Sequence, residues 1–159
     1  MLHKNLLPPL LALLLLVLSV PLRADSFFMV VNKANPILSQ GETAKRKVAR
    51  LYLGERQKWP HGEEAKPIAR RDISVAHLAL LSEVLGMTQT ELDRHWRSRK
   101  QTAGISRPVE IVSAGIALRM VAAMPGAFVM ISANERKSLP EGVAILFEVA
   151  VADAQQARR

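Results

Sequence analysis

Residues 69–78 read "ARRDISVAHL", which places two guanidinium groups, a carboxylate and a hydroxyl directly before an apolar run. An arginine side chain can hold two oxygens of an anion at once, and a serine hydroxyl can donate to a third. The first backbone N–H groups of a helix lack partners inside the helix and lie at the positive end of its dipole, so they also favour an anion. We therefore predict a site for phosphate or a similar small oxyanion. Its residues are Arg70, Arg71, Asp72 and Ser74, with the backbone N–H groups of Val75 and Ala76.

The same residues also allow an interpretation without a ligand. Asp72 and Ser74 are of the types favoured at helix N-caps, where they satisfy the first N–H groups themselves. Asp72 would repel an anion unless its side chain turned away or paired with an arginine. Anion binding and simple capping both remain open at this point.

Other chemistry finds little support in the residue pattern. The chain has no cysteine, which excludes disulfides, thiolate metal sites and a cysteine nucleophile. His61, His77 and His95 are not spaced like metal ligands, and we expect a surface or capping role for each. The chain contains neither a G-x-S-x-G elbow nor a phosphate-binding loop of the G-x-x-x-x-G-K type. We expect a binding protein rather than an enzyme, without a cofactor or a metal.

Residues 1–24 have the pattern of an export signal, with Lys4 near the start, an apolar run from Leu6 to Leu18 and the small residue Ala24. The alternative is a membrane anchor, but the run is shorter than the roughly 20 residues that cross a bilayer. We expect cleavage near Ala24 and a periplasmic domain comprising residues 25–159. Without Lys4 and Arg23 the net charge falls from +8 to +6. Export argues against nucleic acid as a partner, which leaves small anions, anionic lipid and acidic protein surfaces.

The elements that must position the predicted site alternate along the chain. Apolar runs predict strands at 26–32, 65–69, 127–132 and 143–151, and amphipathic spacing predicts helices at 39–54, 75–85, 88–100 and 113–124. Ser39 with Glu42 and Thr88 with Glu91 have capping-box spacing. In the last helix, Ser113 is the expected cap, and the expected buried stripe is Ile116, Met120, Val121 and Met124. This alternation predicts an α/β fold with a single sheet covered by helices. The predicted site then lies where a strand ends and a helix begins, which is where open α/β sheets bind ligands.

Four stretches occur in an order that carries a family resemblance: "VVNKANPILS", "ARLYLGERQKWPHG", "VLGMTQTELDRHW" and "AAMPGAF". Together they resemble the substrate-binding proteins of phosphate ABC transporters, in the type 2 periplasmic binding protein superfamily, and especially small single-lobe members. The resemblance implies a fold like one lobe of such a receptor. In that family the phosphate loop reads R-x-D-G-S-G-T, which aligns with residues 70–76 and puts Arg70 and Ser74 on ligand positions. Here Ile73 and Val75 replace both glycines, and Ala76 replaces the threonine.

Two functions follow as hypotheses. In the first, the chain is an exported solute-binding-like protein that holds phosphate or a similar oxyanion at the start of a helix and serves ABC-type uptake or sensing. In the second, it is a receptor-derived interaction module that has lost its ligand and docks on a membrane sensor or transporter. The lost loop glycines favour the second hypothesis, because glycine allows the closest approach of a ligand to the backbone.

Overall fold

A long strand near the N-terminus lies inside the sheet and organises the fold. The computed structural model describes residues 24–40 and 43–152. Strand β1 (Ala24–Asn32) pairs antiparallel with β4 (Ala127–Ser132) on one side and with β5 (Val143–Ala152) on the other. Strand β2 (Lys66–Ala69) pairs parallel with β4, and the two-residue strand β3 (Val109–Glu110) pairs parallel with β2. The result is one mixed sheet of five strands in the order β3-β2-β4-β1-β5.

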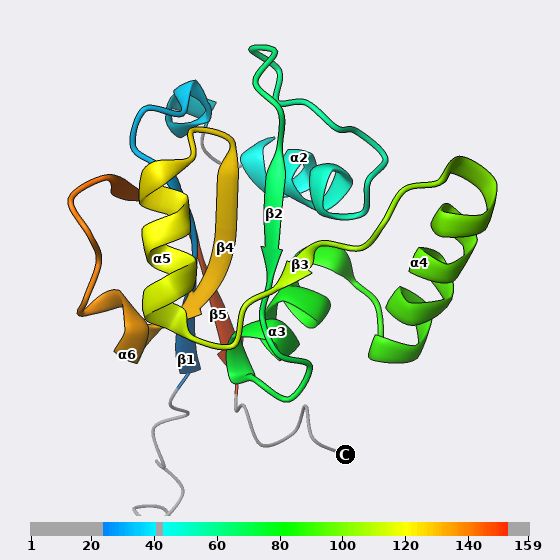
Figure 1. Cartoon of the computed structure of the whole chain (residues 1–159). Helices are drawn as coiled ribbons and strands as arrows, with labels where there is room; N and C mark the ends of the chain where they lie inside the picture. The colour runs from blue at the N-terminus through cyan, green and yellow to red at the C-terminus, as the bar shows by residue number, and fades with distance from the viewer. Residues whose placement is uncertain (1–23, 41–42, 153–159) are drawn as a thin grey trace, which may run out of the picture.

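Helices cover both faces of this sheet (Figure 1). On one face, Phe27, Met29 and Val31 of β1 pack in a cluster with α2 (Thr43–Tyr52), α3 (Val75–Ala79) and α4 (Gln89–Ala103). On the other face, Phe28 and Val30 pack against α5 (Ala114–Ala123). Burial on both faces explains why β1 and β4 are almost continuously apolar rather than alternating. The predicted α/β class with a single covered sheet is confirmed.

The remaining elements are short. A 3₁₀-helix, η1, spans Pro36–Gln40, α3 continues as a π-helix, η2, over Leu80–Leu85, and α6 spans Ala133–Arg136. Gly86 ends η2 in the left-handed conformation with φ 63°.

The structure confirms the predicted capping box of Thr88 and Glu91 and the predicted cap at Ser113. Hydrogen bonds from the backbone and hydroxyl of Thr88 lower the pKa of Glu91 below its usual value.

One local prediction is wrong and another is correct only in part. Ser39 does not begin a helix; it lies inside η1 and its hydroxyl donates to the carbonyl oxygen of Pro36 at 3.0 Å, while its expected partner Glu42 lies outside the described residues. In the predicted stripe of α5, Val121 is buried and Met120 and Met124 are partly buried against the same cluster, as expected, but 45% of Ile116 is exposed. Ala117 and Leu118 complete the buried face. The sequence prediction chose the bulkiest residues, whereas the sheet accepts the small Ala117 close to its surface.

The predicted export signal falls almost entirely on residues 1–23, which lie outside the described residues. In the part that is described, no helix is long and apolar enough to span a membrane.

Candidate functional site

The predicted anion-binding residues lie where β2 ends. Strands β2, β3 and β4 run parallel, so their carboxyl ends share one edge of the sheet. Arg70 follows the last residue of β2 directly, and Ser74 precedes the first residue of α3. The loop therefore lies at the edge of the sheet where ligands gather in open α/β folds, as the sequence predicted.

Ser74 is the N-cap of α3. Its backbone is extended, with φ −73° and ψ 140°, and its hydroxyl oxygen accepts a hydrogen bond from the backbone N–H of His77 at 3.1 Å. The capping interpretation is therefore correct for Ser74, although the hydroxyl hydrogen can still be donated to another acceptor. In the described part of the chain, the N–H groups of Val75 and Ala76 have no hydrogen-bond partner.

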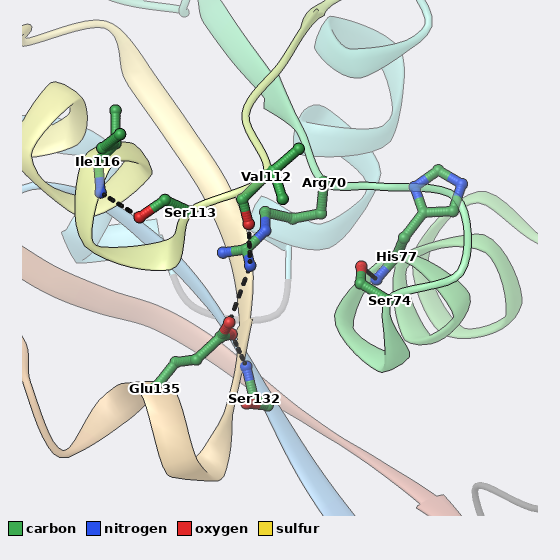
Figure 2. Close-up of polar contacts among 8 residues, drawn as sticks. All are labelled: Arg70, Ser74, His77, Val112, Ser113, Ile116, Ser132 and Glu135. Atoms are coloured by element: carbon green, nitrogen blue, oxygen red, sulfur yellow. Dashed lines mark hydrogen bonds and ion pairs between the residues drawn. The ribbon is translucent and has the colours of Figure 1, made fainter.

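Arg70 points away from Ser74. The residue is 6% exposed, and its Nη2 donates to the carbonyl oxygen of Val112 at 3.2 Å and to Oε1 of Glu135 at 2.9 Å. Figure 2 shows the guanidinium between Val112 and Glu135, with Ser74 and His77 on the other side of the loop. The Nε and Nη1 atoms of Arg70 are buried and have no partner among the described residues. We term Arg70, Val112 and Glu135 the Arg70 corner.

Glu135 reaches the Arg70 corner from α6, on the far side of β4. Its other oxygen, Oε2, accepts from the backbone N–H of Ser132 at 2.9 Å in a capping box. One carboxylate thus caps α6 and neutralises Arg70 at the same time. The sequence analysis missed Glu135, although Ser132 and Glu135 have the capping-box spacing that could have revealed α6.

Arg71 and Asp72 are exposed. Asp72 turns towards His77, with its Oδ1 at 3.9 Å from the ring Nε2, rather than towards either arginine. His77 is 2% exposed and its Nε2 lies 2.7 Å from Oε1 of Gln89, so the expected surface or capping role is wrong for this histidine. Its side chain is held in the interior because α3 packs that face against the sheet and α4.

Asp72 and His77 border a cavity of about 30 Å³ together with Tyr52 and the start of α4. Three carboxylates line it, Asp72, Asp93 and Glu110, against the single cation Arg107, and this charge balance disfavours an oxyanion. Burial and the nearby Asp72 carboxylate raise the pKa of Tyr52 well above its ordinary value, which keeps its hydroxyl protonated. This cavity is therefore not a candidate for the predicted anion.

Exposed apolar side chains surround the Arg70 corner. Five large hydrophobic residues of the described chain are substantially exposed, and all belong to segments that start or end at this edge of the sheet. They are Ile73, Val75, Val109, Val112 and Ile116. We term them the apolar rim, and Val112 belongs both to this rim and to the Arg70 corner.

The six predicted site residues therefore do not converge on one vacant position. Ser74 and the N–H groups of Val75 and Ala76 lie on one side of the loop, and the Arg70 guanidinium lies on the other. In the described residues, no group of three or more histidine or acidic side chains is placed to hold a metal ion.

No protein-family model matches the chain, and no curated protein matches it in sequence. Solved structures do match. A phosphate transport receptor of the ABC type from Vibrio cholerae aligns with a TM-score of 0.53 and 18% identity over 78% of this chain. PstS from Borrelia burgdorferi aligns with a TM-score of 0.56 and 16% identity over 77% of this chain. A phosphate ABC transporter substrate-binding protein from Clostridium perfringens, solved with bound phosphate, gives a TM-score of 0.54 and 18% identity over 79%.

This chain spans only 46% of the length of each of these proteins. At such low identity the likeness shows the fold: a single α/β unit like one lobe-sized part of the phosphate receptors. The structural neighbours are binding proteins.

Proposed function

We propose that the chain is an exported, non-enzymatic binding protein that takes up phosphate or a similar oxyanion at Arg70. The observation that carries this proposal is that the Arg70 guanidinium is buried but incompletely hydrogen-bonded. It is buried, one nitrogen already holds a carboxylate, and the other two nitrogens have no partner among the described residues. Removing an arginine from water is unfavourable unless its N–H groups find acceptors, so a ligand with several oxygens would complete the site.

Glu135 is the internal competitor in this proposal. A carboxylate offers the same negatively charged oxygens as an oxyanion, and it occupies Nη2 of Arg70 at 2.9 Å. Because 24% of the Glu135 side chain is exposed, it can leave towards solvent without disturbing the core. An incoming oxyanion then takes its place on Arg70.

The remaining predicted residues have supporting roles. Once Glu135 has left, Arg70 can turn towards the start of α3, where Ser74 offers its hydroxyl and Val75 and Ala76 their N–H groups. Arg71 is exposed and adds a second cation, and Asp72 faces His77, so it does not oppose the anion directly. In the structure Arg70 faces Val112 and Glu135 instead, so the assignment of all six residues to one site requires this movement of Arg70.

Isothermal titration of residues 25–159 with phosphate and with sulfate tests the proposal. We expect weak binding by the wild type, binding tighter by roughly tenfold in Glu135→Gln, which corresponds to about 1.4 kcal/mol, and no binding in Arg70→Met. Glu141→Gln is the control, because it removes the same charge from an exposed residue of the loop before β5. Absence of heat with both anions at millimolar concentration, in the wild type and in Glu135→Gln, would contradict oxyanion binding.

A second function is favoured by the apolar rim. Exposed hydrophobic residues gathered at one edge are typical of interaction surfaces, and this rim supports a module that docks on a membrane sensor or transporter. The chain should then co-purify with an integral membrane protein that it contacts on the periplasmic side, and this co-purification should persist in Arg70→Ala. It would be lost in Val112→Ser combined with Ile116→Ser, because these changes remove apolar contact area and leave the Arg70 charge in place.

A further inference from the structure

A second cation-rich region lies at the opposite end of β2 from the Arg70 corner. It is an open cavity of about 530 Å³ that is lined by residues of α2 and of the loop 54–65. Figure 1 shows α2 and this loop, which leads into β2. Four cations and four other residues line it: Lys47, Arg50, Arg56 and Lys58, with Leu51, Trp59, Pro60 and Gly62. We term this the basic cavity. Its volume lies within the roughly 300–1,000 Å³ that is usual for small-molecule sites.

The wall formed by the loop is fixed by hydrogen bonds. The N–H of Trp59 donates to the carbonyl oxygen of Glu63 at 2.8 Å, and the N–H of Ala65 donates to that of Gln57 at 2.8 Å. The indole Nε1 of Trp59 donates to the carbonyl oxygen of Gly126 at 2.9 Å, and its ring packs edge-on against Phe128 in the core. A wall held in this way is preformed, which reduces the ordering cost of binding a ligand.

The four charged residues that line the cavity are all basic, while Glu55, Glu63 and Glu64 lie on the same loop outside the lining. Lys47 and Arg50 lie three residues apart on α2, while Arg56 and Lys58 are exposed on the loop. Arg50 has one carboxylate nearby, Glu55 at 3.3 Å, and both side chains are about half exposed. Arg56 and Lys58 have no ion-pair partner among the described residues, and no Asp or Glu of that part of the chain lines the cavity. An anion placed among four cations relieves their mutual repulsion.

The cavity is larger than an inorganic oxyanion needs, and part of its lining is apolar. Pro60 is exposed, whereas Leu51 is 3% and Trp59 is 2% exposed, so the apolar surface open to a ligand belongs mainly to Pro60 and to the alkyl parts of the basic side chains. This combination of a cationic rim and an apolar lining fits a ligand with one charged end and one apolar end. We propose that the basic cavity binds an amphipathic organic anion, in which a phosphate or carboxylate head contacts the cations and an alkyl or aryl body contacts Pro60 and the alkyl parts of the basic side chains.

Titration of residues 25–159 with hexyl phosphate, with inorganic phosphate and with vesicles that contain an anionic phospholipid tests this proposal. We expect hexyl phosphate to bind at least tenfold more tightly than inorganic phosphate. Arg56→Glu combined with Lys58→Glu should weaken hexyl phosphate binding by tenfold or more. If the protein binds the vesicles through Arg56 and Lys58 but does not bind free hexyl phosphate, the ligand of the cavity is the headgroup of a membrane lipid rather than a free organic anion.

Arg94→Glu combined with Arg97→Glu is the matched control. Both residues are exposed on α4, outside the basic cavity, and this double substitution changes the net charge by the same amount. An equal loss of binding in this control would overturn the proposal, because net charge alone would then explain the affinity. Equal affinity for hexyl phosphate and inorganic phosphate, or no binding of any of the three probes, would overturn it as well. The titrations are repeated in Arg70→Met, which removes the proposed oxyanion site. Hexyl phosphate should still bind in this variant, and Arg56→Glu combined with Lys58→Glu should still weaken that binding by tenfold or more, which separates this inference from the proposed oxyanion site.

Discussion

The Arg70 corner and the basic cavity lie at opposite ends of β2, and they differ in the number, burial and pairing of their cations. At the corner, a single guanidinium is 6% exposed and is held by one carboxylate and one carbonyl oxygen. At the cavity, four cations stand around an open space of about 530 Å³, and Arg50 is paired with a carboxylate that is itself 45% exposed. The first region has one desolvated charge with fixed geometry, and the second has many hydrated charges with little fixed geometry.

This difference decides what each region can recognise. A buried charge interacts strongly with whatever replaces water around it, so the corner should discriminate by geometry and hydrogen bonding. Surface charges are screened over about 10 Å at ordinary ionic strength, so the cavity depends on how many cations act together and on the apolar contacts beneath them. Added salt should therefore weaken binding at the cavity far more than binding at the corner.

The largest expected effect concerns the wall of the cavity. A methyl group at position 126 would stand 1.8 Å from the carbonyl oxygen of Glu64, which is backbone and cannot move aside. The carbonyl oxygen of Gly126 also accepts hydrogen bonds from Trp59 Nε1 and from the N–H of Lys66. We expect Gly126→Ala to lower the free energy of unfolding by about 3 kcal/mol, at the upper end of ordinary overpacking, as measured by urea titration.

Gly115→Ala provides the comparison for Gly126→Ala. Gly115 lies in α5, and a Cβ there would meet only side-chain atoms at 3.8 Å. This change should leave the protein as stable as before or stabilise it by roughly 0.5–1 kcal/mol, since alanine favours helix more than glycine does. If both alanines were tolerated equally, the close approach of the Glu64 backbone to residue 126 would not be what fixes the cavity wall.

An intermediate effect is expected at the Arg70 corner. Glu135→Ala leaves the buried guanidinium of Arg70 with the carbonyl oxygen of Val112 as its one described partner. It also removes the carboxylate that accepts a hydrogen bond from the backbone N–H of Ser132. Loss of one partner of a fully buried pair costs about 3–5 kcal/mol, and the partial exposure of Glu135 reduces this to about 1–3 kcal/mol. Urea unfolding of Glu135→Ala, Arg70→Met and the double variant measures the coupling between the two residues. If the pair is the source of the effect, the double variant should be more stable than the sum of the single changes predicts, and a destabilisation equal to or larger than that sum would contradict this.

The fold could be predicted well from the sequence because its main signals are local. The apolar runs of β1 and β4 are long enough to indicate strands buried on both faces, and the capping box of Thr88 and Glu91 indicates where α4 begins. Strand β3 has only two residues and both are exposed, so it has no apolar pattern that a sequence could reveal. It exists because β2 offers a free edge to pair with.

The candidate site was predictable in its position but not in its geometry. The motif from Arg70 to Ser74 correctly predicted the junction between a strand and a helix and the cap at Ser74. The direction of the Arg70 side chain is set by Glu135, which is 65 residues away, and by Val112, which is 42 residues away. Likewise no local pattern marks Lys47 and Arg50 of α2 as part of a cavity. They line one because Trp59 anchors the facing loop to Gly126, 67 residues away.

The smallest expected effect comes from the corresponding carboxylate at the cavity. Glu55 lies 3.3 Å from Arg50, much as Glu135 lies beside Arg70, but the two side chains are 45% and 53% exposed. Exposed ion pairs contribute about 0–1 kcal/mol, so Glu55→Gln should change the free energy of unfolding by at most about 0.5 kcal/mol in urea titrations. The same substitution should strengthen hexyl phosphate binding by a few fold, because it removes a negative charge beside the cavity. If Glu55→Gln destabilised the protein as much as Glu135→Ala, burial would not be what distinguishes the two regions, and the selectivity expected for each of them would lose its physical basis.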